Sequence, residues 1–435
     1  MPIEKFFNAK SFAVIGASRD SKKVGNIIFK NLLKSNLDVF PINPKAEIIV
    51  GHHAYPDILS LPYKIDCAVI AVKSEQVPDI LYECGKKQVK SAVVISAGFS
   101  ESGNLELENE IKKIAEQFNI TLLGPNVLGF LDTSRHINAT FFRGMPNLGK
   151  LAFISQSGAL GVGILDKFIQ QNLGLSSFVS IGNSASTDFS DFIEYFSKDK
   201  NTEIIALYIE SLKQNRGQRF LDVCRKCRKP IFAIKSGKTE AGQKASQSHT
   251  AALATNPKIY SGIFQQAGII EIENIMQLIN IAKLYKKFHN LKKACIVTNA
   301  GGLGVLTADY LAQKNIQIPK LPENITKKLS EFLPTSWSKN NPVDLIGDAL
   351  AETYEKTILV LDNQNFFDFF IILLTPQHMT QPLETAQLLI KLKKPVIACF
   401  LGGNQVSQAL LFLKQNNIPF FTEPQDIAEV LDKLK

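Results

Sequence analysis

The chain has 435 residues, which is too long for one ordinary hydrophobic core and predicts two to four domains. Hydrophobic residues make up 45% and charged residues 20%, and no low-complexity tract interrupts them, so the composition argues against a disordered protein. The net charge of +9 comes from lysines spread along expected helices rather than from a tight basic cluster, which disfavours nucleic acid as a partner.

The cysteines and the apolar runs predict a cytoplasmic protein. Six cysteines are scattered along the chain, the N-terminus has no apolar signal region, and no apolar run approaches 18 residues. We therefore expect reduced thiols and no membrane insertion. The one Cys-x-x-Cys pair, Cys224 and Cys227, lacks a second pair, so we expect a plain helix there and no metal ligands.

Short β-branched strands alternate with helical segments along the whole chain. SFAVIGAS at 11–18 is the first example, and DFFIILLTP at 368–376 is typical of later ones. Nearly continuous apolar strands that end in small or polar residues predict parallel sheets covered on both faces. The predicted fold class is α/β.

The first unit is typical of a nucleotide-type site. A strand runs into Gly16 and a polar turn, and a helix carrying Ile27, Ile28 and Leu32 follows, so helix amides can face an anion. The segment lacks GxGxxG, which leaves a nicotinamide-dependent oxidoreductase as a minor alternative. We expect the strands of this Rossmann-like domain to fill residues 1–130.

The rest of the chain contains an internal repeat. LAFISQSGALGVGIL at 151–165 matches ACIVTNAGGLGVLTA at 294–308, and the match continues to the last helix. Residues 147–290 and 291–435 are therefore predicted to form two flavodoxin-like parallel-sheet domains.

The two copies differ by one polar insert. After KSG the first copy carries KTEAGQKASQSHTAALATNPKI, whereas the second copy has only NQVSQ after LGG. Because the second copy closes without it, the insert indicates function rather than fold. It contains one histidine, His249, with small residues on both sides. Histidine is a good nucleophile and phosphoryl carrier near neutral pH, and a loop or capping histidine is the alternative.

Two further groups are expected near His249. Glu210 ends the expected strand IIALYIES and would orient the imidazole. The second copy has Pro376 or Gln377 near that place, and the alternative role of Glu210 is a helix cap. A phosphate cradle is expected where a strand opens into a helix, with a plain tight turn as the alternative. Its residues are Ser155, Gln156, Ser157 and Gly158.

These motifs resemble the α subunit, or α half, of NDP-forming acyl-CoA synthetases, the superfamily of ADP-forming acetyl-CoA synthetase and succinyl-CoA synthetase. The resemblance covers nearly the whole chain, through VIGASRDSKKVGN, PINPK, SAGFSESG, LGPNVLGF, SQSGALG, SIGN, LYIES, KSGKTEAGQKASQSHT, TNAGGLGV and NPVDLIGD. It implies that the first domain binds coenzyme A. The implied contacts are Gly16, Ala17, Ser18 and Arg19 at the pyrophosphate, Lys23 and Lys45 at phosphates, Ser96, Ala97 and Gly98 beside the pantetheine, and Asn126 at the active-site end.

The resemblance also implies a reaction and a partner. An acyl-CoA and phosphate give an acyl phosphate and free CoA, the acyl phosphate phosphorylates His249, and the phosphohistidine makes ATP or GTP from the diphosphate at a second site. Glu210 would orient His249, and the cradle at Ser155–Gly158 would bind the phosphorylated ring. The nucleotide and Mg²⁺ would bind an ATP-grasp β subunit, since no segment is left over for that domain, so a hetero-oligomer is expected.

Three segments depart from the family pattern, at four positions. Ala251 replaces a glycine after SHT, Val127 replaces a cysteine after GPN, and in GNSASTD Ser184 and Ser186 replace a basic and an acidic residue. These departures indicate an unusual substrate or a weakened enzyme. A non-catalytic, CoA- or acyl-CoA-binding regulatory module is the alternative function, and the acyl group, the nucleotide and the oligomeric state are left open.

Overall fold

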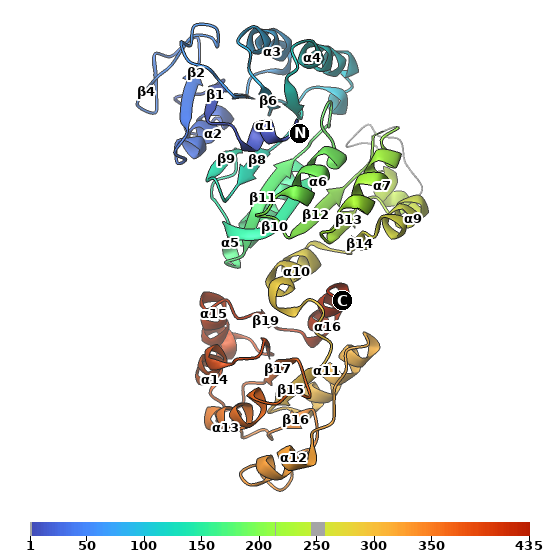
Figure 1. The fold of residues 1–435 in the computed structure, drawn as a ribbon. Coiled ribbons are helices and arrows are strands. Elements are labelled where there is room, and N and C mark those ends of the chain that lie inside the picture. The colour runs from blue at the N-terminus through green and yellow to red at the C-terminus, as the bar shows by residue number, and fades with distance from the viewer. Residues whose placement is uncertain (1, 214, 245–256) are drawn as a thin grey trace. The chain divides into compact units, whose positions relative to one another are not determined.

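The computed structural model describes residues 2–213, 215–244 and 257–435, which form two compact units, Met1–Ile275 and Met276–Lys435 (Figure 1). Unit 1 contains two large sheets and a two-stranded hairpin, and unit 2 contains one sheet. The polar insert, with His249 and Ala251, lies largely within residues 245–256, outside the described residues.

The first sheet of unit 1 is parallel, in the order β2-β1-β5-β6-β7. If these five strands are numbered by their position in the sequence, their spatial order is 2-1-3-4-5. The order in which the chain adds strands reverses between β1 and β5, and sheets of this kind bind ligands at the carboxyl ends of the strands on either side of that point. All residues of β1 are buried, as expected for a strand covered on both faces. The elements are α1 Glu4–Phe7, β1 Ser11–Ile15, α2 Val24–Leu32, β2 Asp38–Ile42, the hairpin β3 Ile48–Ile49 and β4 His52–His53, β5 Cys67–Ile70, α3 Val77–Lys86, β6 Ser91–Val94, α4 Leu105–Gln117 and β7 Thr121–Leu123.

The second sheet has the order β14-β13-β12-β10-β11-β8-β9, in which β8 runs antiparallel to both of its neighbours and the other pairs are parallel. β8 and β9 follow the first sheet in sequence, but β8 pairs with β11 of the second sheet and β9 pairs with β8. The elements are β8 Gly129–Asp132, β9 Ile137–Thr140, β10 Asn147–Ser155, α5 Gly158–Gln170, β11 Gly174–Ser180, α6 Phe189–Lys198, β12 Ile204–Ile209, α7 Gly217–Lys226, β13 Ile231–Lys235, α9 Pro257–Ala267 and β14 Ile270–Glu271.

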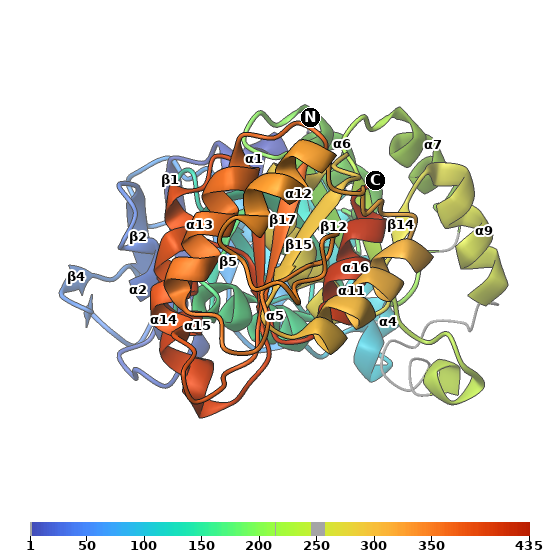
Figure 2. The same ribbon diagram turned by 90° about the horizontal axis from the view of Figure 1, so that it is seen from below.

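Unit 2 repeats the parallel part of the second sheet. Its order, β16-β15-β17-β18-β19, is again 2-1-3-4-5, which confirms the repeat inferred from the sequence. Helices α11 and α16 pack together on one face, and α13, α14 and α15 lie on the other (Figure 2). The elements are α10 Ile275–Phe288, β15 Ala294–Thr298, α11 Gly301–Gln313, α12 Glu323–Ser330, β16 Val343–Asp344, α13 Ala351–Asp362, β17 Phe369–Leu374, α14 Pro382–Leu388, β18 Val396–Phe400, α15 Ser407–Gln415, β19 Phe420–Phe421 and α16 Pro424–Lys433.

Aromatic side chains join the two sheets of unit 1 into one core. Phe7 of α1 stacks on Tyr195 of α6, with ring centroids 4.6 Å apart, and meets Phe130 of β8 edge-on at 5.4 Å. Phe7 is 1% exposed, so its burial stabilises the fold by roughly 1.5–3 kcal/mol. This core holds the loops of both sheets in one body.

Two expectations from the sequence can be compared with the described part of the chain. No described helix combines the length and apolar character needed to cross a bilayer. Within the described residues, no group of three His, Cys, Asp or Glu side chains is arranged to hold a metal ion. Cys224 lies buried in α7, and burial raises its pKa to about 12, which suits an inert thiol.

Candidate functional site

Two glycines, one in the turn after β1 and one in α2, bring these two segments close together. Gly16 has φ +89°, and a Cβ there would lie 2.3 Å from the Ala71 carbonyl oxygen. A Cβ on Gly25 of α2 would lie 2.0 Å from the Gly16 oxygen. Only glycine allows the start of α2 to approach the turn this closely.

Asparagine side chains fix the carbonyl groups of this turn. Asn43, after β2, donates from Nδ2 to the Ala17 oxygen at 2.7 Å, and Asn26 donates to the Ser18 oxygen at 2.6 Å. The Asn43 Oδ1 also accepts the backbone N–H of Lys45 at 2.8 Å. The motif PINPK therefore joins Lys45 to the turn that contains Ala17 and Ser18.

Exposed cations surround the turn. Arg19, Lys23 and Lys45 are all exposed, so an anion that binds at the turn can reach their charged groups. Arg143 adds a fourth cation, because its Nη2 donates to the Ser21 oxygen at 3.4 Å. The sequence analysis missed Arg143, which lies 122 residues further along the chain and carries no local signal of this contact.

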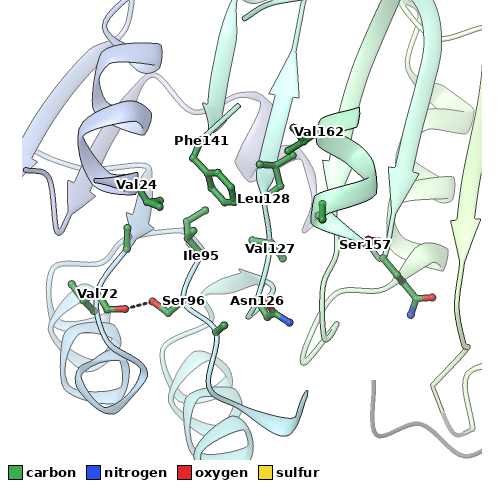
Figure 3. A pocket seen from close by; sticks show the side chains of 15 residues that line it. Val24, Val72, Ile95, Ser96, Asn126, Val127, Leu128, Phe141, Ser157 and Val162 are labelled. Atoms are coloured by element: carbon green, nitrogen blue, oxygen red, sulfur yellow. Dashed lines mark hydrogen bonds between the residues drawn. The ribbon is translucent and has the colours of Figure 1, made fainter. Parts of the chain in front are cut away.

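A cavity of about 730 Å³ lies between loops of the two sheets in unit 1 (Figure 3). Six of the predicted site residues line it: Ser96, Ala97, Asn126, Gln156, Ser157 and Gly158. The other described candidates do not line it: Gly16, Ala17, Ser18, Arg19, Lys23, Lys45, Gly98, Ser155 and Glu210. Val24, the neighbour of Lys23, does line it, so the cavity begins where the turn after β1 ends.

The loop at Ser96–Gly98 is held from both sides. The Ser96 hydroxyl donates to the Val72 oxygen at 2.6 Å, as Figure 3 shows, and the Ser96 oxygen accepts the Asn126 N–H at 2.9 Å. Gly98 has φ +107°, and its N–H donates to Glu101 Oε1 at 2.6 Å. Gly98 therefore shapes the loop that Ser96 and Ala97 present to the cavity.

Asn183, of the SIGN motif, connects this loop to the second sheet. Its Oδ1 accepts from Asn126 Nδ2 at 3.3 Å, and its Nδ2 donates to Glu108 at 2.9 Å and also to Glu101. Partial burial of Glu101 favours the neutral carboxyl, but hydrogen bonds from Asn183 and the Gly98 amide outweigh it and lower the pKa of Glu101. The ionised form of Glu101 thus stabilises the loop.

We expect the Glu101→Gln variant to be less stable than the wild type at pH 7, because the hydrogen bonds to the charged carboxylate are lost. The expected loss is only about 1 kcal/mol, since solvent reaches this side chain and screens its charge. A carboxyl whose pKa is lowered by folding contributes stability above its ordinary pKa and loses it as the pH falls through the lowered value. The difference in urea midpoint between wild type and variant should therefore shrink on acidification below about pH 4. The exposed Glu106→Gln is the control for removing a nearby carboxylate and should change the urea midpoint at pH 7 less than Glu101→Gln does. An equal difference at all pH values would contradict this role of the charge.

The cradle Ser155–Gly158 and Glu210 lie together at the point where the second sheet reverses its strand order, after β10 and β12. Gln156 Oε1 accepts the backbone N–H groups of Glu210 at 2.6 Å and Ser211 at 2.9 Å. Ser157 caps α5, its hydroxyl accepting the Leu160 N–H. Glu210 is only 9% exposed.

The repeat places Thr375 opposite Glu210. Thr375 follows β17 as Glu210 follows β12, and Pro376 and Gln377, which were expected near that place, are the next two residues. Asn299, the counterpart of Gln156, bonds Thr375 at both its N–H and its carbonyl oxygen, each at 3.0 Å. In both copies an amide side chain thus joins the ends of two neighbouring strands. At the position after the second of these strands, the first copy has the carboxylate of Glu210 and the second copy has Thr375.

Lys235 is a site residue that the sequence analysis missed. It ends β13, is 8% exposed, and donates from Nζ to the Glu210 oxygen at 2.9 Å while lying 4.5 Å from the ring centre of Tyr260. Burial lowers the pKa of Lys235, and the Glu210 charge opposes this shift. A signal was present, because the second copy has Phe400 at the same strand end.

The fold and site define a class of protein in which a nucleotide-type domain and a flavodoxin-like domain share one cavity. Three family models match successive parts of the chain: a CoA binding domain at residues 10–132, a succinyl-CoA ligase like flavodoxin domain at 148–285 and a ligase-CoA domain at 294–431. The chain belongs to the family of α-type subunits of NDP-forming acyl-CoA synthetases, which confirms the resemblance and the three-domain α/β fold class.

Known relatives align over almost the whole chain. The α subunit of acetate–CoA ligase (ADP-forming) II from Pyrococcus furiosus is 38% identical, over 98% of this chain and 96% of that protein. An acetate–CoA ligase (ADP-forming) from Methanocaldococcus jannaschii is 44% identical over 98% of this chain. This chain spans 62% of the length of that relative, and also 62% of one from Archaeoglobus fulgidus that is 38% identical over 97% of this chain.

A solved structure supports the same assignment. An acetyl-coenzyme A synthetase from Candidatus Korarchaeum cryptofilum, in complex with phosphate and ADP, matches with a TM-score of 0.93 and 35% identity. The match covers 100% of this chain and 96% of that chain. The match extends over all three domains of this chain.

Proposed function

We propose that this chain is the CoA- and phosphohistidine-bearing subunit of an NDP-forming acyl-CoA synthetase that works with an ATP-grasp β subunit. The observation that carries the proposal is the shared cavity of unit 1, lined on one side by Ser96 and Asn126 and on the other by Gln156–Gly158. A thioester held by the first group would face a phosphate held by the second. We expect the complex to be a cytoplasmic hetero-oligomer.

The described residues fit coenzyme A as a substrate. Gly16 and Gly25 have no side chains, so the turn and the start of α2 lie close together and their backbone can face a pyrophosphate. The exposed Arg19, Lys23 and Lys45 supply positive charge there. Ser96, Ala97 and Asn126 then lead from the turn toward the cradle. The pantetheine arm would follow this path.

The chemistry follows from this placement. Phosphate attacks the thioester carbonyl, the C–S bond breaks, and an acyl phosphate and free CoA result. The His249 ring then takes the phosphoryl group, which releases the carboxylic acid, and later passes it to ADP or GDP. The amides at the start of α5 would stabilise the negative charge at each stage, and Mg²⁺ on the partner would neutralise the nucleotide phosphates.

The role proposed for Glu210 depends on how its strand end is held. Lys235 and Gln156 hold its backbone from two sides, so the carboxylate projects from a fixed strand end. A carboxylate that accepts one ring N–H leaves the other nitrogen as the nucleophile. We therefore propose Glu210 as the residue that orients His249.

Two of the departures from the family pattern, Val127 and Ser184, remove no group that the proposed reaction needs. Val127 is 3% exposed and contributes a wall to the cavity, where a hydrocarbon side chain changes packing rather than chemistry. Ser184 is buried and does not line the cavity.

The test is a turnover assay of the chain with its ATP-grasp partner. We expect an acyl-CoA to release CoA only when phosphate, the nucleoside diphosphate, Mg²⁺ and both chains are present. CoA binding without turnover under any of these conditions would instead favour the regulatory alternative. Parallel assays with ADP and GDP would identify the nucleotide.

A further inference from the structure

Lys235 and Tyr260 form a buried contact beside Glu210. Lys235 ends β13, Tyr260 lies in the first turn of α9, and both side chains are buried. The Lys235 Nζ lies 4.5 Å from the centre of the Tyr260 ring and donates to the backbone oxygens of Glu210 and Ser236. A buried ammonium is costly without partners, and here two carbonyl groups and an aromatic face supply them.

Tyr260 also holds the segment that follows Glu210. Its hydroxyl accepts the backbone N–H of Leu212 at 2.9 Å. On the same segment, Gln156 Oε1 accepts the N–H groups of Glu210 and of the residue after it, and Lys235 binds the Glu210 oxygen. Three side chains therefore fix four backbone groups around the carboxylate, which leaves this strand end little freedom to move.

The repeat shows that the fold does not require this contact. Phe400 ends β18 as Lys235 ends β13, and a threonine stands in place of Glu210. Counted back from the positive-φ residue that follows each helix, Tyr260 aligns with Ala409 of α15. All three differences fall at one place in the domain, so the lysine and the tyrosine accompany the carboxylate rather than the sheet.

The contact also joins the two ends of the polar insert. Lys235 lies just before the insert in sequence, and Tyr260 directly follows its last residue, Ile259. Both ends of the segment that carries His249 are therefore held next to the carboxylate that is proposed to orient it.

We infer that Lys235 and Tyr260 are positioning residues for the phosphoryl-transfer half of the reaction, and that they act by holding Glu210 and the ends of the insert in register with His249. The inference rests on the proposed function. Neither residue is among the described residues that line the cavity in which the thioester is proposed to react. Their loss should therefore slow phosphoryl transfer and leave thioester cleavage intact.

The experiment separates these two halves in the complete complex with its ATP-grasp partner, using acetyl-CoA, phenylacetyl-CoA and succinyl-CoA as probes. When arsenate replaces phosphate, an arsenate oxygen attacks the thioester carbonyl, the C–S bond breaks, and CoA leaves as a thiolate that takes up a proton. Water then hydrolyses the acyl arsenate to the acid and arsenate. CoA release with arsenate thus needs no phosphoryl carrier, whereas label transfer from phosphate to the protein does.

Lys235→Met removes the ammonium and keeps an unbranched side chain. We expect label transfer and turnover with phosphate to fall about tenfold or more, while CoA release with arsenate and the KM for acyl-CoA stay within about twofold. Lys229→Met is the matched control. Lys229 lies before the other end of β13 and also donates to two backbone oxygens, those of Phe196 at 2.6 Å and Asp199 at 2.5 Å. Its loss should change neither reaction.

Tyr260→Phe tests the inference with the buried ring left in place. It removes only the hydroxyl that accepts the Leu212 N–H, so turnover with phosphate should fall about threefold and CoA release with arsenate should not change. If Lys235→Met no longer binds CoA, that variant is misfolded and Tyr260→Phe decides.

The possible failures are distinguishable. An equal fall of both reactions in a variant that still binds CoA, or a fall in neither, would overturn the inference. A loss of turnover in Lys229→Met as large as in Lys235→Met would overturn it as well. If the wild-type complex releases CoA with neither phosphate nor arsenate, the proposed function fails and the inference with it.

Discussion

Replacing His249 by alanine is expected to abolish transfer of radiolabelled phosphate to the protein and to lower turnover of the complete complex by about a thousandfold or more. An effect of this order follows the loss of a covalent nucleophile, because the route that passes the phosphoryl group to the nucleotide then lacks its carrier. The wild-type label should be acid-labile and base-stable, as a phosphorus–nitrogen bond requires. The measurement is label retention after gel separation, with an acyl-CoA present and with and without the ATP-grasp partner.

His289→Ala serves as the control for this experiment. His289 is exposed just after α10, and its Nδ1 lies 2.9 Å from the Tyr285 oxygen, so its loss should change neither label nor turnover. Full activity of His249→Ala in the reconstituted complex would contradict the phosphohistidine proposal. Loss of label in both variants would instead indicate a general effect on folding.

Replacing Gly16 by alanine should destabilise unit 1 by about 3 kcal/mol or more and abolish CoA binding. The new Cβ would lie 2.3 Å from the Ala71 oxygen, a backbone atom that cannot move aside alone, and φ +89° adds strain of its own. Relief requires β1 and the segment after β5 to separate at the proposed pyrophosphate turn. Urea unfolding and CoA titration measure the two effects.

Gly103→Ala is a control that measures the strain of a positive φ without a steric clash. Gly103 has φ +85°, and a Cβ there would meet nothing within 4 Å, so the substitution should cost only about 1–2 kcal/mol of conformational strain. Its CoA affinity should stay at the wild-type value. A Gly16→Ala chain as stable as Gly103→Ala would show that the turn relaxes freely and would contradict the packing argument.

Much of the fold was predictable because its signals are local. Continuous apolar strands that end in small or polar residues predicted parallel sheets, and β1, β12 and β17 are buried almost throughout. The repeat was equally visible, since the same strand order requires the same spacing of strands and helices. The exact counterpart of Glu210 was missed because the sequence match does not show where β17 ends.

Some parts of the candidate site were also predictable from local sequence, and others were not. The turn at Gly16 and the cradle at Ser155–Gly158 each lie within one strand–turn–helix segment, so a short stretch of sequence marks them. Lys235 was detectable in principle, because a lysine in a buried strand contrasts with Phe400 in the other copy. Its role was overlooked because KSG was used only to mark the end of the strand and the start of the insert.

The sequence by itself determined the class of the protein, the repeat and the local turns, since each depends on the order and spacing of neighbouring residues. Only the tertiary structure decided which distant groups meet. Arg143 reaches the turn at Ser21 across 122 residues, and Asn183 joins Asn126 to Glu101 and to Glu108 of α4. The cavity that Phe141 and Val162 help to line also exists only in three dimensions. Its chemistry depends on which side chains of separate elements face one cavity, and that is set by the packing of two sheets on a common core.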